Sequence, residues 1–374
     1  MQIIKKKEHP GNVLFLIGIL LELLVMMAGH SQWTLPFSGR ITHIAFVLFG
    51  CKILTTYYSK AEWVAIILAS GLGMVSYLTC GDEYVIRAVV MVVAAKNIDW
   101  NKVLKTIFSV AAVGTAVIVL LALTGGLGEL VDIRDYGRGA VEARWCLGFS
   151  HANNVHDMFW YLTVLLFLIK REYRWWQYLL LFMADVGLYL LTASRTGFLA
   201  VGILIGATAL FQYFPKWNES ILVYIIGTFA LGTCMFFTIM GAMYGKNSPL
   251  VAFADRFFNQ RLNMCFDHAN ITQWQLFPEY RSFEKAVDNG FGAFFYQYGI
   301  VMGIVVVFLL LFTIFRLYRE QNGVVLSMLV TYIFVWFMET TFIVNTSMLC
   351  NLFFVLLFER WYRLTERGKN VESI

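Results

Sequence analysis

Apolar runs that are too long for the interior of a small soluble domain constrain the fold of this chain more than any other feature. A helix needs roughly 20 mostly apolar residues to cross the hydrocarbon core of a bilayer. The sequence offers about twelve segments of this kind. They lie at 12–29, 41–58, 62–79, 84–95, 104–125, 156–169, 176–193, 197–214, 220–241, 293–315, 323–339 and 341–358. Because 59% of the residues are hydrophobic and only 14% are charged, we expect an all-α integral membrane protein that forms one membrane domain over 1–374.

Lysine and arginine in the short loops predict the orientation of the chain, since these residues concentrate on the cytoplasmic side of membrane proteins. Nearly all of the loop cations fall on one side of the predicted topology, and the opposite short loops contain only Arg40 and Arg195. We therefore expect a multi-pass protein of the plasma (inner) membrane with both termini in the cytoplasm. The net charge of +5 follows from this bias, so membrane lipid is an expected partner and nucleic acid is not.

Two long polar segments, 126–155 and 242–292, form the large outer loops of this topology. In the second, Ser248 and Pro249 are typical of a helix start, and apolar residues then recur at helical spacing as far as Cys265. This pattern predicts one amphipathic helix on the membrane surface. A short outer turn at 192–197 separates the two loops in the sequence, and we expect the three outer segments to converge on one face.

Ionisable residues inside the predicted helices are few, and each is costly in hydrocarbon unless it is paired or faces a wet cavity. They are Glu22, Lys52, Arg87 and Asp185. Arg87 fits a cavity under the outer loops, a side chain that snorkels to the membrane surface, or a pair with Asp82 or Glu83. Asp185 fits a proton or ion site of a transporter, or a hydrogen-bonded pair inside the bundle.

Arginine on the outer face is the strongest indication of chemistry. Its permanent charge and forked donors suit phosphate oxygens, so these residues are candidates for binding a pyrophosphate head group. They are Arg134, Arg138, Arg144, Arg195, Arg256, Arg261 and Arg281. Pairing with nearby acids or with anionic lipid is the alternative for each of them. Arg195 has no acid close to it in the sequence, which favours a ligand-binding role there.

Two histidines and one aspartate are candidates for a general base. His151 and His268 each begin a His-Ala-Asn tripeptide in an outer loop, and imidazole titrates near neutral pH. Asp288 precedes a predicted helix and fits either a base or an N-cap. His151, His156 and Asp157 could suggest a metal site, but no second ligand cluster stands at metal-binding spacing. The sequence also has no P-loop, no dinucleotide fingerprint and no outer Asp-x-Asp pair, so we expect neither cofactor nor metal.

Four short pieces carry a resemblance to a known family. In order they are Gly-Phe-Ser-His-Ala-Asn-Asn at 148–154, Ser-Arg-Thr-Gly at 194–197, Gln-Arg-Leu at 260–262, and Asp-Asn-Gly-Phe at 288–291 leading to Tyr-Gly-Ile-Val at 298–301. Together they resemble the Wzy-type polysaccharide polymerases, which are related to the O-antigen ligases. Two positions depart from the family pattern: Gln260 stands where glycine usually precedes the arginine, and Ala152 stands where proline is common.

The resemblance implies a metal-independent glycosyltransferase on the outer face of the membrane. A growing glycan would pass from undecaprenyl diphosphate to a sugar hydroxyl of another lipid-linked repeat unit. Arg195 and Arg261 match the family's arginines and would hold the diphosphate, with Arg138, Arg144 and Arg281 as further candidates. A flippase and a chain-length regulator are the protein partners that such an activity implies.

The same resemblance implies roles for the candidate catalytic residues. Asp288 occupies the place where the related ligases carry a histidine, so it would be the general base, with His268 and His151 as rivals. Glu339 is similar to an acid that the family carries at the end of the penultimate helix.

Two alternative functions share parts of this sequence pattern. An O-antigen ligase-type transferase would use the same arginines but would favour histidine at position 288. A flippase or transporter of lipid-linked repeat units would more often show internal repeats and polar or broken helices near the membrane midplane. Here the ionisable residues gather in the outer loops and no repeat is detectable, which favours an enzyme.

Overall fold

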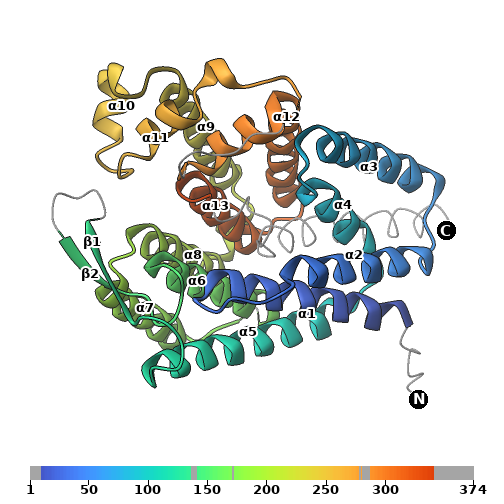
Figure 1. The fold of residues 1–374 in the computed structure, drawn as a ribbon, viewed down its shortest axis with the longest axis horizontal. Coiled ribbons are helices and arrows are strands. Elements are labelled where there is room, and N and C mark those ends of the chain that lie inside the picture. Colours follow the sequence, from blue (N-terminus) through green and yellow to red (C-terminus); the bar gives the residue numbers. More distant parts are fainter. Residues whose placement is uncertain (1–9, 136–140, 171, 278, 280–286, 341–374) are drawn as a thin grey trace. The chain divides into compact units, whose positions relative to one another are not determined.

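The computed structural model describes residues 10–135, 141–170, 172–277, 279 and 287–340, and the chain is mostly helical over these residues (Figure 1). Each predicted apolar segment from 12–29 to 323–339 lies on a helix, whereas 341–358 lies outside the described residues. Among the described helices, six are long and apolar enough to cross a membrane: Gly11–His30, Lys60–Cys80, Trp100–Leu123, Arg195–Tyr213, Ile221–Asn247 and Gly290–Arg319. These findings are those of a helical membrane protein.

The chain packs as two compact units, the first of which includes residues up to 29 and 34–111. Its helices are α1 (Pro10–His30), α2 (Ser38–Leu54), α3 (Lys60–Cys80), α4 (Tyr84–Ala94) and the first half of α5 (Trp100–Leu123). Within this unit α4 packs against α2 and α3. Phe15 contacts Phe49 and Trp100, with ring centroids 5.4 and 5.9 Å apart, so an aromatic cluster joins α1, α2 and α5.

A buried ion pair neutralises two of the charges inside the first unit. Nη2 of Arg87 donates to both carboxylate oxygens of Glu22 at 2.7 Å, and both side chains are buried. Nη1 of Arg87 also lies 3.6 Å from Glu83. The predicted pairing of Arg87 with Glu83 is therefore confirmed. The stronger partner is Glu22, which lies 65 residues away in the sequence.

The second unit contains residues 30–33 and the described residues from 112 to 340. Its elements are β1 (Val131–Asp135), β2 (Val141–Trp145), α6 (Ala152–Ile169), α7 (Trp175–Thr192), α8 (Arg195–Tyr213), α9 (Ile221–Tyr244), α10 (Pro249–Ala254), α11 (Arg261–His268), α12 (Gly290–Arg319) and α13 (Gly323–Met338), with short 3-10 turns at Pro215–Asn218, Gly245–Asn247 and Ile271–Gln273. α8 packs against α6, α7 and α13, and α9 packs against α11, α12 and α13 (Figure 1).

The first predicted outer loop contains a β-hairpin, so the expectation of a purely helical protein needs a correction. β1 and β2 pair antiparallel, with Val131 opposite Trp145 and Asp135 opposite Val141. The hairpin satisfies its backbone hydrogen bonds between its own strands, which allows a polar loop to be ordered outside a helix bundle.

The second outer loop also differs from the prediction, because the expected single amphipathic helix is broken into α10 and α11. Ser248 caps α10 as predicted, its hydroxyl accepting from the backbone N–H of Val251 at 3.4 Å. α10 ends at Ala254, and the turn that separates it from α11 closes with left-handed backbone at Asn259 and Gln260, with φ of 52° and 64°. The carboxylate of Asp255 starts α11 by accepting from two of its first N–H groups.

α12 is kinked at Gly299, whereas the apolar run at 293–315 predicts an uninterrupted helix. Gly299 has φ of 81°, and a side chain there would come within 2.7 Å of the backbone of Phe277. The N–H groups of Ile300 and Val301 are freed from the helix and donate to the carbonyls of Gln275 and Leu276 at 2.8 and 3.1 Å. The kink therefore ties the second outer loop to α12.

Candidate functional site

Arg261, the first residue of α11, is the centre of a buried polar network. Its Nη2 donates to Oε1 of Glu339 at 2.6 Å, and its Nη1 donates to Oγ1 of Thr196 at 3.0 Å. Glu339 directly follows the last residue of α13, and Thr196 is in the first turn of α8. All three residues are buried. The pair therefore joins the ends of α8, α11 and α13.

The network continues from Glu339 to the first outer loop. Nδ2 of Asn153 donates to Oε1 of Glu339 at 2.9 Å, and Oδ1 of Asn153 accepts from Nη2 of Arg144 at 2.9 Å. Nε of Arg144 donates to the carbonyl of Thr192 at the end of α7. We call these five residues, Arg144, Asn153, Thr196, Arg261 and Glu339, the buried network. It links β2, α6, α8 and α11, so the three segments that are predicted to be outer, 126–155, 192–197 and 242–292, lie together as the sequence predicts.

Burial controls the electrostatics of two acids around Arg261. It raises the pKa of the Glu339 carboxyl, and the guanidinium of Arg261 opposes this rise. Burial likewise raises the pKa of Asp255, against which the backbone N–H groups of Leu262 and Asn263 act. A charge held out of water is tolerated only with a partner of opposite sign and satisfied hydrogen bonds, so Arg261 and Glu339 depend on each other.

Asp288 lies at the exposed edge of the network. Its Oδ2 is 3.9 Å from Nε of Arg261, and 39% of its side chain is exposed. Nε of Arg261 is buried and forms no hydrogen bond with the residues that the structure describes. The N-cap interpretation of Asp288 is wrong, because the side chain of Asn289 caps α12 by accepting from the N–H of Gly292 at 2.8 Å. The carboxylate of Asp288 is thus left facing solvent beside an arginine.

An open pocket of about 520 Å³ lies next to the buried network. It is lined by Arg195, Lys246, Ala252, Asp255, Arg256, Asn259 and Gln260, and we call it the cation pocket. Two residues of the pocket are sequence neighbours of network residues: Arg195 precedes Thr196, and Gln260 precedes Arg261.

The cation pocket carries more positive than negative charge. Arg195, Lys246 and Arg256 are exposed and form no ion pair within the described part of the chain. The single acid of the pocket, Asp255, accepts from the N–H groups of Leu262 at 2.9 Å and Asn263 at 3.1 Å and attracts Lys246 over a longer distance. Three cations around one engaged acid form a site for an anion with several oxygens.

The sequence gives no reason to choose Lys246 as an anion ligand, and it offers Arg256 only as one of seven arginines in the predicted outer segments. Both flank α10, within 15 residues of Arg261. The break between α10 and α11 is what turns these cations toward Arg195 in one pocket, and no composition signal marks that break.

The remaining candidate residues lie in other places. His151 is the N-cap of α6, where its Nδ1 accepts from the N–H of Asn153 at 3.2 Å. His268 is the half-buried last residue of α11. Neither is among the described residues that line the cation pocket. Arg138 and Arg281 lie outside the described residues, so their predicted roles stay predictions.

A buried histidine supports the turn that presents Arg195. Nε2 of His156 lies 3.2 Å from Oδ1 of Asp185, and Nδ1 lies 2.9 Å from Oγ1 of Thr192. The hydrogen-bonded interpretation of Asp185 is therefore confirmed. Gly197 packs directly on the His156 ring, where an added side chain would collide. The Ser-Arg-Thr-Gly turn thus needs its glycine because α6 and α8 approach closely there.

Comparisons with protein-family models, curated proteins and solved structures found no match to this chain. The function is therefore inferred from the residues and geometry of the site.

The left-handed backbone at Gln260 gives a test of how the site is built. Both Gln260→Gly and Gln260→Ala remove the contacts of the side chain, but only glycine relieves the strain of φ 64°, which costs roughly 1–2 kcal/mol for other residues. We expect the glycine variant to exceed the alanine variant in free energy of unfolding by about 1 kcal/mol, measured by denaturant titration in detergent. Equal stability of the two variants would contradict the left-handed turn.

Proposed function

We propose that this protein is a polymerase of a bacterial surface polysaccharide. It transfers a growing glycan from undecaprenyl diphosphate to a sugar hydroxyl of another lipid-linked repeat unit on the outer face of the membrane. The observation that carries the proposal is the cation pocket, in which Arg195, Lys246 and Arg256 share one cavity without ion pairs among the described residues. Three of the four sequence pieces that resemble the polymerases supply residues of the pocket or of the adjoining network, and the fourth supplies Asp288, which lies 3.9 Å from Arg261.

The cation pocket supplies what the departing diphosphate requires. The acceptor oxygen forms a bond to C1 of the donor sugar, the bond from C1 to the diphosphate oxygen breaks, and the electron pair leaves with undecaprenyl diphosphate. Fixed cations at the leaving group stabilise the charge that grows there in the transition state. Arg195 can grip two phosphate oxygens at once, and Lys246 and Arg256 line the same pocket.

Asp288 is the general base in this proposal and takes the proton of the acceptor hydroxyl. Its carboxylate is exposed to an incoming sugar and lies beside Arg261. Glu339 and Asn153 are positioning residues, because they hold Arg261 in place from the buried side. His268 and His151 remain the rival bases.

The lipid part of the substrate matches the apolar face of α10. Leu250 and Phe253 of α10 are exposed by 47% and 59%, and Phe257, in the turn that follows α10, is exposed by 70%. Such a face lies in the membrane interface, where an isoprenoid chain would meet it while its diphosphate enters the pocket. The proposal includes about twelve membrane spans, cytoplasmic termini, a plasma-membrane location, and a flippase and chain-length regulator as partners.

Arg195→Ala tests the diphosphate site. We expect glycan polymerisation to fall about 100-fold or more, the size of effect seen when one transition-state donor is removed. The assay uses purified protein with undecaprenyl-diphosphate-linked repeat units, without nucleotide or metal, and follows product length on a gel.

Arg40→Ala is the matched control, because Arg40 is the other cation of the predicted short outer loops and does not line the cation pocket. It should keep wild-type activity. Folded wild-type protein that leaves the correct lipid-linked substrate unchanged would contradict the polymerase, and transport of the repeat unit in vesicles would then be tested.

Asp288→Asn separates the candidate bases. General bases contribute about 10²–10⁴ to the rate, so we expect a loss of that order in kcat with little change in KM. His268→Ala and His151→Ala should keep kcat within about threefold, because a residue that takes no part in the proton transfer does not contribute to this rate factor. Loss of kcat in His268→Ala together with an active Asp288→Asn protein would move the role to the histidine.

A further inference from the structure

A second pocket lies at the other end of α8 from Arg195. α8 runs over 19 residues from Arg195 to Tyr213, which at 1.5 Å per residue is about 28 Å. This length matches the hydrocarbon core of a bilayer, which is about 30 Å thick, and α8 is one of the helices apolar enough to cross it. The Tyr213 end of α8 therefore belongs at the membrane surface opposite the cation pocket.

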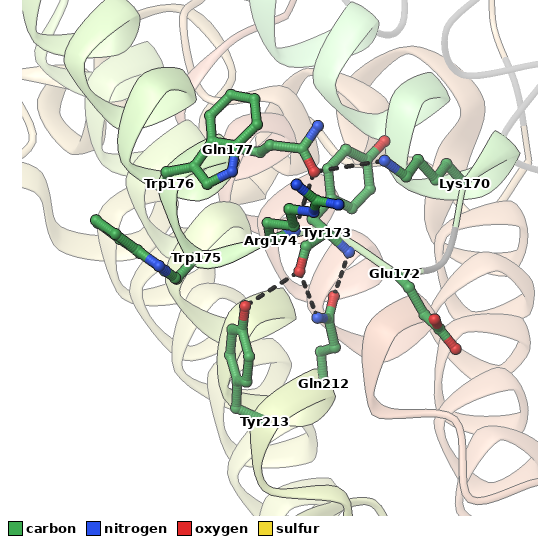
Figure 2. Close-up of a pocket in the computed structure, with 9 residues that line it drawn as sticks. All are labelled: Lys170, Glu172, Tyr173, Arg174, Trp175, Trp176, Gln177, Gln212 and Tyr213. Carbon is green, nitrogen blue, oxygen red and sulfur yellow. Dashed lines mark hydrogen bonds between the residues drawn. The ribbon is translucent and has the colours of Figure 1, made fainter.

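This second pocket has a volume of about 620 Å³ and is formed by the connection between α6 and α7 together with the end of α8. It is lined by Lys170, Glu172, Tyr173, Arg174, Trp175, Trp176, Gln177, Gln212 and Tyr213 (Figure 2). We call it the α6–α7 pocket. Gln212 fixes its floor by accepting from the N–H of Tyr173 at 2.8 Å and donating to the carbonyl of Tyr173 at 2.6 Å. The hydroxyl of Tyr213 donates to the same carbonyl at 3.1 Å.

Two cations face this rigid frame. Oε1 of Gln177 accepts from Nζ of Lys170 at 3.4 Å and from the backbone N–H of Arg174 at 2.9 Å. Nζ of Lys170 also lies 4.8 Å from the centre of the Tyr173 ring. The guanidinium of Arg174 forms no ion pair within the described part of the chain, and Glu172 points away from Arg174 and Gln177 (Figure 2). The pocket therefore favours an anion.

An exposed apolar stripe leads from the pocket along α7. Trp176, Leu179, Leu180 and Met183 are exposed by 45–63% and follow each other at i, i+3, i+4 and i+7. Residues at this spacing share one face of a helix. A polar, cationic cavity directly above an apolar stripe matches an amphiphile with an anionic head, whereas a free anion would gain nothing from the stripe.

We propose that the α6–α7 pocket binds the phosphate head group of an anionic membrane phospholipid. Lys170 and Arg174 hold the phosphate, Trp175 and Trp176 lie at the level of the head groups, where tryptophan is enriched in membrane proteins, and the acyl chains follow the stripe on α7. This site is separate from the cation pocket and does not depend on the proposed function.

Native mass spectrometry of the full-length protein in detergent tests this site. Phosphatidylglycerol and phosphatidylcholine are added separately to wild type, to Lys170→Ala/Arg174→Ala, and to the control Lys216→Ala/Arg319→Ala. The control removes two exposed cations that do not line the pocket. We expect wild type and control to bind one phosphatidylglycerol at least fivefold more tightly than phosphatidylcholine, and the pocket variant to lose that preference while keeping the same unfolding temperature.

Two results would overturn the assignment. One is equal phosphatidylglycerol binding by the pocket variant and the control. The other is displacement of the bound lipid by inorganic phosphate at the same micromolar concentration, which would identify a site for free anions. Unchanged lipid binding in the presence of inorganic phosphate would support the assignment of the α6–α7 pocket to a phospholipid.

Discussion

The buried pair of Arg261 and Glu339 is the interaction on which the proposed site depends. Each charge alone would be strongly destabilising in the interior, because removing one partner of such a pair costs about 3–5 kcal/mol. The 2.6 Å hydrogen bond between them can form only when α11 meets the end of α13. Through Thr196 and Asn153 the same pair also requires the first turns of α8 and α6 to be present.

This arrangement divides four of the arginines that are predicted to face outward into two groups with different roles. Arg144 and Arg261 are buried, and each donates to two partners in other segments, so they fix the positions of the loops. Arg195 and Arg256 are exposed and keep their charge for a ligand. The division is sharpest at the start of α8, where Arg195 turns outward and Thr196 turns inward, because consecutive residues of a helix point to different sides.

The sequence predicts the helices of this protein well, because a run of roughly 20 apolar residues rarely forms anything other than a membrane-spanning helix. It predicts less where structure depends on distant partners. Glu22 and Arg87 are far apart in the chain, so their pairing leaves no local pattern. The break before Arg261 is hidden for a different reason: apolar spacing continues through Phe257 and Phe258, and the left-handed residues are Asn259 and Gln260 rather than glycine. The family that the sequence resembles usually carries glycine at the position of Gln260, and this glycine is the sequence signal that indicates a left-handed turn. Burial of Arg261 is likewise invisible in composition, since a charged residue in a polar loop is usually solvated.

An electron cryo-microscopy structure of the protein with undecaprenyl diphosphate bound would show where the diphosphate is held. We expect both phosphates in the cation pocket, within hydrogen-bonding distance of Arg195 and of Lys246 or Arg256, with Arg261 and Glu339 still paired behind them. Diphosphate bound at another place while this pocket stays empty would contradict this expectation.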